Sequence, residues 1–308
     1  AGQRVIMHQI GGHTDFPVLF YVISEMFHGQ HAWYRLPLLR VAFQGEPGAY
    51  SEQAVFNYFG DVETVPCESF DVMFDAVVSG KSDAALAPIE NSLAGSIHQN
   101  YDLLLRHNLH IVGEYFLRVQ HCLIAMPGVQ MADIKKAISH PQALGQCAAY
   151  LRNHGIKAEQ VYDTAGSVKM LKESGARDTA AIASRRAAEL YGMNILEEGI
   201  EDNPENFTRF LAIQHEAVIP TEEAKTSIVF TLKNQPGALF KAMSVFALRD
   251  IDLTKIESRP LQGKPWEYLF YIDFIGAAHE ETTKRALDHL GEYAVTLRVL
   301  GSYPRFKG

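Results

Sequence analysis

The stretch AALAPIENSLAGSIHQNYDLLL (residues 84–105) shows how the first part of this 308-residue chain is built. Residues 84–88 are mostly apolar, which predicts a short buried strand. After the polar run Glu90-Asn91-Ser92, apolar residues recur at helical spacing and predict an amphipathic helix. The stripe consists of Ile97, Tyr101, Leu104 and Leu105. A strand, a polar loop and a helix together form the repeating unit of an α/β fold.

The same alternation extends over residues 40–216. Further strands are expected at 41–43, 112–125, around Val161, at 180–183 and at 208–213. Helices are expected around 54–59 and 143–151, from Ser167 and from Arg185. Strands that alternate with helices are typical of crossover connections, so we expect a mostly parallel sheet.

A differently patterned tail follows a charged segment that contains Pro220. We expect this segment, residues 217–225, to be a linker at a domain boundary. Residues 226–304 then show the order strand, helix, strand, strand, helix, strand. This βαββαβ order is the ferredoxin-like arrangement.

The composition excludes several classes of protein. The net charge of −8 and the lack of a basic block argue against a nucleic-acid partner. Phe16 to Ser24, the longest apolar stretch near the start, is far below the roughly 20 residues that span a bilayer, so we expect no membrane partner. Three widely spaced cysteines fit neither a disulfide framework nor a zinc site, so a reducing cytosol is expected.

Residues 1–39 are rich in histidine and aromatic residues and have no clear periodicity, so we treat them as an extension of unknown role. Their histidines, which do not follow a metal-ligand spacing, are His8, His13, His28 and His31. The segment also lacks the features of a signal or transit peptide.

Small and polar residues fill four junctions between an expected strand and the helix after it. These junctions are residues 45–51, 90–96, 139–142 and 163–167. Free N–H groups at a helix start attract anions, worth about 0.3–1 kcal/mol per exposed charge. A single junction of this kind is more often a plain helix cap. Four of them together predict a site for a small anion.

The segment Asn206-Phe207-Thr208-Arg209-Phe210 opens the last strand before the linker. Arg209 could hold a carboxylate, and the hydroxyl of Thr208 could donate to a leaving oxygen. The alternative is an ordinary strand threonine and a surface arginine. His140 is either an acid or base or a helix cap. The P-loop lysine and the zinc motifs are absent, so we expect no metal.

Six segments of this region strongly resemble the prephenate dehydratase family, which includes the plant arogenate dehydratases. They are GEPGAYSE (45–52), PIENSLAGSIHQNYDLLL (88–105), SHPQALGQC (139–147), DTAGS (163–167), AIASRRAAELYG (182–192) and NFTRF (206–210). In the tail, GALF (237–240) and KIESRP (255–260) resemble the two signatures of the ACT regulatory domain. The resemblance does not cover residues 1–39.

The resemblance implies a catalytic domain over residues 40–216, with two α/β lobes around a cleft as in type II periplasmic binding proteins, and an ACT domain over 226–304. It implies catalytic roles for Thr208, Glu90, Asn91 and Gln142. It implies substrate contacts for Arg209, Phe210, Ser92, Thr164, His140 and Ser51. Effector contacts are implied for Gly237, Ala238, Leu239, Phe240, Glu257, Ser258 and Arg259.

Such an enzyme decarboxylates and dehydrates prephenate to phenylpyruvate on the route to phenylalanine. Thr208 would assist the departing hydroxyl, and no cofactor is needed because the product gains an aromatic ring. Phenylalanine would inhibit by binding between the regulatory domains of a homodimer or homotetramer.

Two alternatives stay open. One is arogenate dehydratase or mixed activity, and the other is a non-catalytic amino-acid-binding protein. Because no plastid-like transit peptide is visible, we expect a cytoplasmic enzyme that prefers prephenate.

Overall fold

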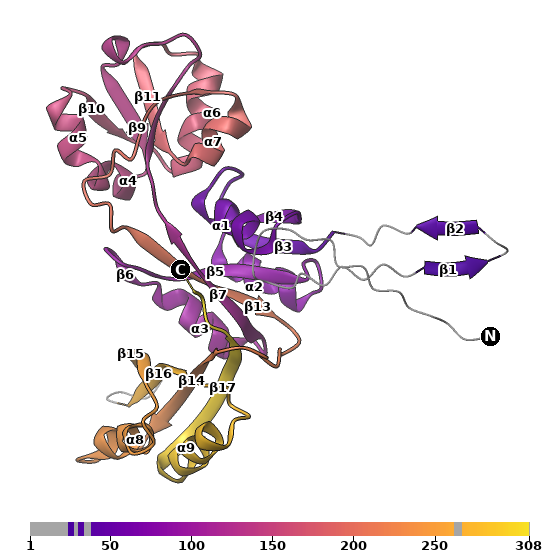
Figure 1. The fold of residues 1–308 in the computed structure, drawn as a ribbon. Coiled ribbons are helices and arrows are strands. Elements are labelled where there is room, and N and C mark those ends of the chain that lie inside the picture. Colours follow the sequence, from indigo (N-terminus) through magenta and orange to yellow (C-terminus); the bar gives the residue numbers. More distant parts are fainter. Residues whose placement is uncertain (1–23, 28–29, 34–37, 262–266, 308) are drawn as a thin grey trace.

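The computed structural model describes residues 24–27, 30–33, 38–261 and 267–307. Three bodies are stacked along the molecule: lobe 1 (β3–β7 and β13), lobe 2 (β8–β12) and the C-terminal domain (β14–β17). Lobe 2 is at the top, lobe 1 in the middle and the C-terminal domain at the bottom of Figure 1. Strands β1 (Ser24–Phe27) and β2 (Gln30–Trp33) pair antiparallel apart from these bodies. His8, His13 and His28 lie outside the described residues.

Lobe 1 is built on a sheet with the order β4-β3-β5-β13-β7. Its strands are β3 (Arg40–Gln44), β4 (Glu63–Cys67), β5 (Ala84–Asn91), β7 (His110–Arg118) and β13 (Phe207–Gln214), and the short β6 (Gly95–Ser96) pairs with β5. The apolar side chains of α1 (Tyr50–Phe59) share one core with Phe210, whereas those of α2 (Phe70–Val78) and α3 (His98–Arg106) share another with Leu211.

Lobe 2 has a sheet with the order β10-β9-β11-β8-β12. Its strands are β8 (Cys122–Ala125), β9 (Lys136–Ser139), β10 (Lys157–Gln160), β11 (Thr179–Ala183) and β12 (Asn194–Glu198). Its helices are the short η1 (Met131–Asp133), α4 (Pro141–Gln146), α5 (Ala148–Asn153), α6 (Thr164–Ser174) and α7 (Arg185–Tyr191).

The prediction of a mostly parallel sheet is confirmed only in part. Three neighbouring strands in each lobe are parallel, namely β4-β3-β5 and β10-β9-β11, but β13 and β8 run antiparallel to both of their neighbours. The cause is the chain path, because the chain crosses from β7 to β8 and returns from β12 to β13. The predicted two-lobed α/β class is confirmed.

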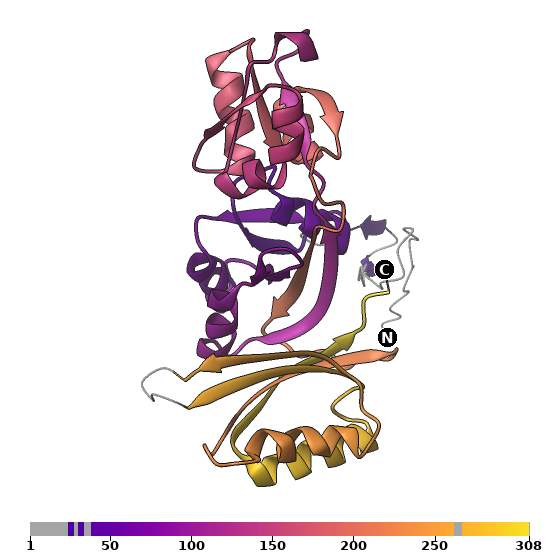
Figure 2. The ribbon, with the colours of Figure 1, turned by 90° about the vertical axis from the view of Figure 1, so that its left-hand side faces the viewer.

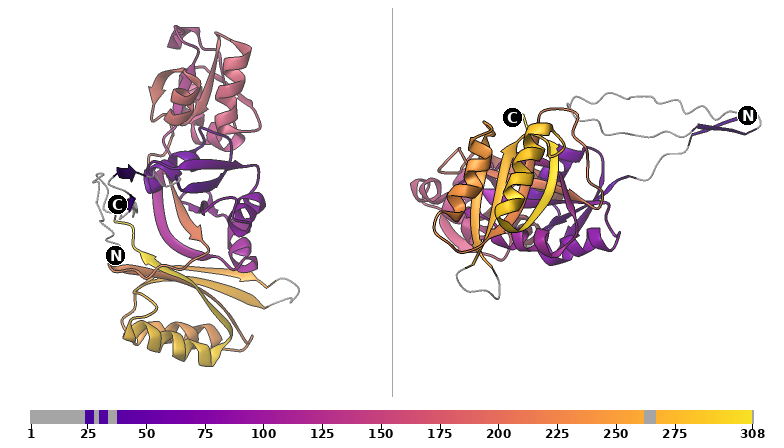
Figure 3. Two further views of the ribbon diagram at one scale, coloured as in Figure 1. Left: turned by 90° about the vertical axis from the view of Figure 1, so that its right-hand side faces the viewer. Right: turned by 90° about the horizontal axis from the view of Figure 1, so that it is seen from below.

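The C-terminal domain has the predicted βαββαβ order. Strands β14 (Ala224–Leu232), β15 (Leu253–Pro260), β16 (Tyr268–Ile275) and β17 (Ala294–Pro304) form an antiparallel sheet in the order β15-β16-β14-β17. Helices α8 (Ala238–Ala247) and α9 (Glu281–Tyr293) cover the face away from lobe 1 (Figure 2), where they lie side by side when seen from below (Figure 3).

The other face of this sheet packs on lobe 1. Leu269, Tyr271 and Leu300 share one buried apolar cluster with Leu104 and Leu211 of lobe 1. The contact is also close at the backbone, since a Cβ on Gly301 would lie 2.0 Å from the carbonyl oxygen of Ile111. The two bodies therefore share a continuous core.

Two long predicted elements are each divided in the structure. The extended stretch 112–125 is broken between β7 and β8, where the chain crosses to lobe 2. The expected helix 143–151 is two short helices that meet at Cys147, whose φ of −116° is not helical.

The helix expected from Ser167 begins at Thr164, because the side chain of Asp163 accepts from the N–H of Gly166 and caps it there.

Candidate active site

The carboxyl ends of the parallel strands in the two lobes face each other. The hydroxyl of Ser184, directly after β11, donates to the carbonyl oxygen of Gly48, just after β3, at 2.6 Å. Parallel strands end at the same edge of their sheet, so β3, β4 and β5 all end toward lobe 2 and β9, β10 and β11 toward lobe 1. All four predicted anion junctions follow one of these strand ends.

Thr208 and Asn91 lie opposite each other at this edge, where β13 begins and β5 ends. The side-chain N–H₂ of Asn91 donates to Thr208 Oγ1 at 3.0 Å and to Asn206 Oδ1 at 2.8 Å. Its Oδ1 accepts from the backbone N–H groups of Leu93 and Ala94 at 3.0 and 2.9 Å. These partners fix the orientation of the amide. Since Thr208 accepts from Asn91, its own hydroxyl proton is directed elsewhere and can be donated.

Ser92 joins the two strands beside this pair. Its hydroxyl donates to the carbonyl oxygen of Glu205 at 2.7 Å and accepts from the N–H of Phe207 at 2.9 Å. The only proton of the hydroxyl is therefore used within the protein. These contacts support a role in holding the site together more than the substrate contact that was predicted for Ser92.

The predicted residues of lobe 2 begin helices on the facing edge. His140 caps α4, and its Nδ1 accepts from the N–H of Gln142, whose side chain is exposed. Thr164 is the first residue of α6. In lobe 1, Ser51 lies half-buried in the first turn of α1. The structure places these four residues at the facing ends of the two lobes.

A cavity of about 410 Å³ lies between the lobes. Lobe 1 lines it with the segments after β3 and β4, and lobe 2 lines it with Tyr162 and Asp163. Its acidic residues are Glu46, Glu68 and Asp163, which would repel an anionic substrate. Thr208 lies farther along the edge, because β5 and β13 follow β3 in the sheet order. We therefore place the candidate reaction centre at Asn91 and Thr208 and not in this cavity.

Arg209 and Phe210 have surroundings that differ from those predicted. Phe210 is fully buried in the core of lobe 1, among residues that include Phe43 and Val55. Arg209 is 6% exposed and donates to Glu114 Oε2 at 2.9 Å and to Asp273 Oδ2 at 2.5 Å. Alternate residues of a strand point to opposite faces, so Arg209 lies on the face opposite Thr208. Their contacts do not support the predicted roles in substrate binding.

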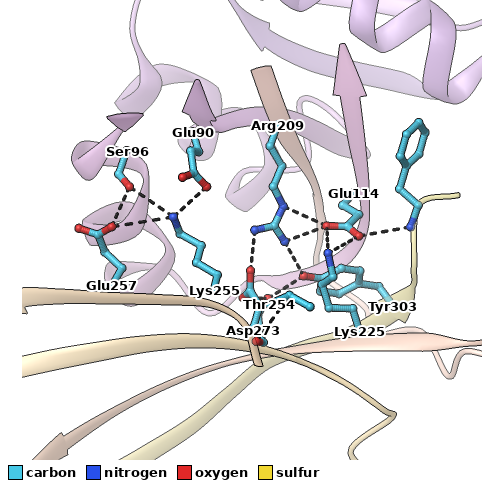
Figure 4. Close-up of polar contacts among 12 residues, drawn as sticks. Glu90, Ser96, Glu114, Arg209, Lys225, Thr254, Lys255, Glu257, Asp273 and Tyr303 are labelled. Carbon is cyan, nitrogen blue, oxygen red and sulfur yellow. Dashed lines mark hydrogen bonds and ion pairs between the residues drawn. The ribbon is translucent and has the colours of Figure 1, made fainter. Parts of the chain in front are cut away.

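Glu90 also points away from the pair. Its carboxylate binds Lys255 Nζ of the C-terminal domain at 2.8 Å (Figure 4). As the neighbour of Asn91 in an extended strand, Glu90 projects from the other face of the sheet. The contacts of Glu90 therefore do not support the catalytic role that was predicted for it.

The buried charged groups around Arg209 strongly affect one another's pKa values. Burial opposes the charge on Arg209, but Asp273, Tyr303 and Glu114 outweigh it and raise the pKa of Arg209 well above its usual range. Burial and the guanidinium of Arg209 lower the pKa of Lys225, although Lys225 Nζ lies 2.7 Å from Glu114 Oε1. The cluster thus contains two cations and two carboxylates between lobe 1 and the C-terminal domain.

Sequence reasoning missed the partners in this cluster. Glu114 and Asp273 each interrupt an otherwise apolar strand, in HIVGEYFLR (110–118) and YLFYIDFI (268–275). A carboxylate in a buried strand requires a partner, so both residues signalled a buried ion pair. Local sequence patterns do not reveal that the partners belong to different domains.

The predicted effector residues divide into two groups. Ala238 and Leu239, at the start of α8, line a cavity of about 130 Å³ with Asn234, Tyr268 and Phe270. Gly237 precedes them with a φ of 78°, and Phe240 is exposed.

On β15, by contrast, two of the predicted residues face lobe 1. Glu257 Oε2 accepts from Ser96 Oγ at 2.8 Å, and Arg259 Nη2 lies 3.0 Å from Asp102 Oδ2. Ser258 between them is exposed. Ser258 pairs with Phe270 of β16, which lines that cavity, whereas Glu257 and Arg259 lie on the face toward lobe 1.

Two α/β lobes with facing strand ends, followed by a βαββαβ domain, define a two-lobed α/β protein with an additional ferredoxin-like domain. The sequence model of prephenate dehydratase matches residues 41–218, and that of the ACT domain matches residues 226–292. The chain belongs to the prephenate dehydratase family, and its enzyme class is that of a hydro-lyase.

Three proteins illustrate the similarity. Arogenate dehydratase/prephenate dehydratase 2, chloroplastic, of Arabidopsis thaliana is 52% identical over 277 residues, which cover 86% of this chain and 73% of that protein. Prephenate dehydratase of Arthrobacter aurescens, solved in complex with L-Phe, has a TM-score of 0.79 and 33% identity and covers 87% of this chain and 90% of its own. GqqA, described as a novel type of quorum quenching acylase, has a TM-score of 0.81 and 36% identity and covers 86% of this chain and 97% of its own.

None of the helices in the described ranges is both long and apolar enough to cross a membrane.

Proposed function

We propose that this protein converts arogenate to phenylalanine and prephenate to phenylpyruvate, with Thr208 as the group that assists loss of the ring hydroxyl. In both reactions the ring loses its carboxylate as carbon dioxide and its hydroxyl as water, and the product is aromatic. The observation that carries the proposal is the Asn91–Thr208 hydrogen bond at the edge that faces lobe 2. It orients a hydroxyl donor at the edge of lobe 1 that faces the polar helix starts of lobe 2.

The barrier of such a reaction lies in the poor leaving group. A hydroxyl that donates to the departing oxygen gives general-acid assistance worth about 10²–10⁴-fold. Asn91 donates to Thr208 and so increases the polarity of that hydroxyl, because hydrogen bonds in a chain strengthen one another. Gln142, His140 and Thr164 lie on the facing lobe, where they could orient the substrate carboxylates.

The proposal includes both substrates because the Arabidopsis relative is named for both activities, although the sequence analysis favoured prephenate. The substrates differ only in the side chain, where arogenate carries an amino group and prephenate a keto oxygen. The ring chemistry at Thr208 is the same for both.

The C-terminal domain is proposed to bind L-phenylalanine as an inhibitor. The cavity beside Ala238 and Leu239 and the description of the Arthrobacter relative as a complex with L-Phe support this proposal. We expect a homodimer or a homotetramer, and light scattering after gel filtration distinguishes these states from a monomer.

The cellular compartment is likewise proposed. A cytosolic location was expected from the sequence, but the name of the Arabidopsis relative places that protein in the chloroplast, which favours the plastid here. Fractionation of cells that express the gene in its native host decides between the two compartments.

Purified protein is to be mixed with arogenate and with prephenate in separate reactions. The Thr208→Val variant keeps the side-chain shape without the hydroxyl, so its kcat should fall about 100-fold or more while KM changes little. Thr282→Val, at an exposed position of α9, is the matched control and should behave as wild type.

Full activity of Thr208→Val would remove the hydroxyl from the mechanism. Failure of the wild-type protein to act on either compound would reject the function. Hydrolysis of an acyl amide under the same conditions would instead favour the activity described for GqqA.

A further inference from the structure

Four charged residues join lobe 1 to the C-terminal domain in a regular arrangement (Figure 4). Glu90 and Arg209 are opposite each other on β5 and β13. Lys255 and Asp273 are opposite each other on β15 and β16. Lys255 Nζ lies 2.8 Å from Glu90 Oε2, and Arg209 Nη1 lies 2.5 Å from Asp273 Oδ2. We name these four residues the charge quartet.

The charge quartet is largely removed from solvent. The side chains of Arg209, Asp273 and Lys255 are 7%, 11% and 11% exposed, and only Glu90, at 38%, has substantial access to water. Exposed ion pairs have little effect on structure, whereas a buried charge strongly requires its partner. The two pairs therefore constrain how β15 and β16 sit against β5 and β13.

The constraint acts next to the candidate reaction centre. The residues opposite each other at the adjacent position of the same two strands are Asn91 and Thr208. Because neighbouring residues share a backbone, a shift of Glu90 or Arg209 moves Asn91 or Thr208 as well. The hydrogen bond between Asn91 and Thr208 is 3.0 Å long, so a small displacement of either strand breaks it.

We propose that Lys255 is a positioning residue for the dehydratase reaction, which it supports from the C-terminal domain by fixing Glu90 and hence the Asn91–Thr208 pair. The proposal rests on the function proposed above for this site. It also gives the C-terminal domain a route to the reaction centre. A ligand that moves β15 and β16 changes the fit of Lys255 and Asp273 to lobe 1.

The local surroundings of Lys255 make it suitable for mutation. Its Nζ lies 5.9 Å from the centroid of the Tyr101 ring, and methionine is an unbranched side chain that can fill the space of the lysine stem. Water can replace the ammonium at the partly exposed Glu90, so we expect the variant to fold. Lys255→Arg keeps the positive charge and should restore pairing with Glu90.

The experiment compares kcat, KM and inhibition by L-phenylalanine in the full-length protein. Lys255→Met should lower kcat about fivefold or more with KM within twofold, and should weaken inhibition by a similar factor. Lys255→Arg should recover most of both. Arg298→Met is the control. Arg298 also binds lobe 1 from the C-terminal domain, but within the described residues its hydrogen bonds go to the carbonyls of Leu105, His107 and Leu109 and not to β5 or β13. Its kcat should equal that of wild type.

A second measurement does not depend on any variant. Hydrogen exchange of the wild-type protein with and without L-phenylalanine should show a change in peptides that cover residues 88–96 and 206–210. Wild-type kcat and inhibition in Lys255→Met, or equal losses in Lys255→Met and Arg298→Met, would overturn the proposal. So would unchanged exchange in both peptides when the effector is shown to bind. If the wild-type protein has no dehydratase activity, the proposed function fails instead.

Discussion

Lobe 1 has two interfaces that are built in opposite ways. Toward lobe 2 it makes neutral or partly exposed contacts, such as Ser184 with Gly48 and Tyr50 with His121. Toward the C-terminal domain it has a continuous apolar core and the buried cluster around Arg209 and Glu114. The first interface is suited to opening for a substrate, whereas the second holds two bodies in a fixed relation. Such a difference is needed if one interface admits ligands and the other transmits a signal.

The largest effect is expected at the charged interface. Glu114→Gln keeps the shape of the side chain but removes its negative charge. The buried cations of Lys225 and Arg209 then lose a shared ion-pair partner. Breaking a buried ion pair in this way costs about 3–5 kcal/mol of the free energy of unfolding, measured by urea denaturation. Glu281→Gln is the control. It breaks an exposed ion pair with Arg285 in α9 and should leave the urea midpoint of unfolding unchanged. Equal midpoints for the two variants would contradict the contrast between the interfaces.

A smaller effect is expected where the lobes meet. Gly48 has a φ of 92°, and a Cβ there would lie 3.0 Å from Cα of Ala187 in α7. Gly48→Ala should cost about 1–3 kcal/mol through backbone strain and should also lower kcat, because the lobes cannot approach as closely. Gly80→Ala has a similar φ of 71° but open space around its Cβ, and it serves as the control. We expect this variant to lose stability without losing kcat, and equal losses of kcat would reject the role assigned to the lobe contact.

The sequence predicted local elements better than their arrangement. Helical spacing located α1, α3 and α8, and the order of elements in the tail was enough to predict the βαββαβ domain. The direction of β8 and β13 could not be read from local patterns, because it depends on where the chain crosses between lobes. Strands β10 and β12 were missed or misplaced because their exposed, charged residues lack the apolar alternation of a half-buried strand.

The family resemblance placed Asn91, Thr208, Gln142 and Thr164 in one cleft. The structure brings the side chains of Asn91 and Thr208 into contact and puts Gln142 and Thr164 on the facing lobe, and the catalytic roles of these residues stay predictions. Arg209 and Glu90 were expected beside them, but their side chains belong to the opposite face of the sheet. A one-residue step along a strand reverses the face, so proximity in sequence was a poor guide here. The partners that hold them, Lys255 and Asp273, belong to another domain and were not foreseeable from local sequence.

The smallest expected effect concerns the histidine at the crossing between the lobes. His121 lies between Tyr50 of lobe 1, whose hydroxyl is 2.8 Å from Nδ1, and Gln146 of lobe 2, whose Oε1 is 2.8 Å from Nε2. Burial lowers the pKa of His121, although the hydrogen bond with Gln146 and the charge of Glu201 oppose the shift. The neutral ring is therefore the form that the folded protein prefers.

This preference gives a pH dependence with a definite sign. Below the usual histidine pKa of about 6.5, the unfolded chain binds a proton at this position while the folded protein still resists it, so stability falls as the pH decreases. The contribution of one group cannot exceed about 1.4 kcal/mol per pH unit. His121→Gln should reduce the slope of the unfolding free energy between pH 7 and pH 5, whereas His279→Gln, at an exposed position, should not. Identical slopes for His121→Gln and wild type would mean that the folded protein binds a proton at His121 as readily as the unfolded chain does, and the preference for the neutral ring would be wrong.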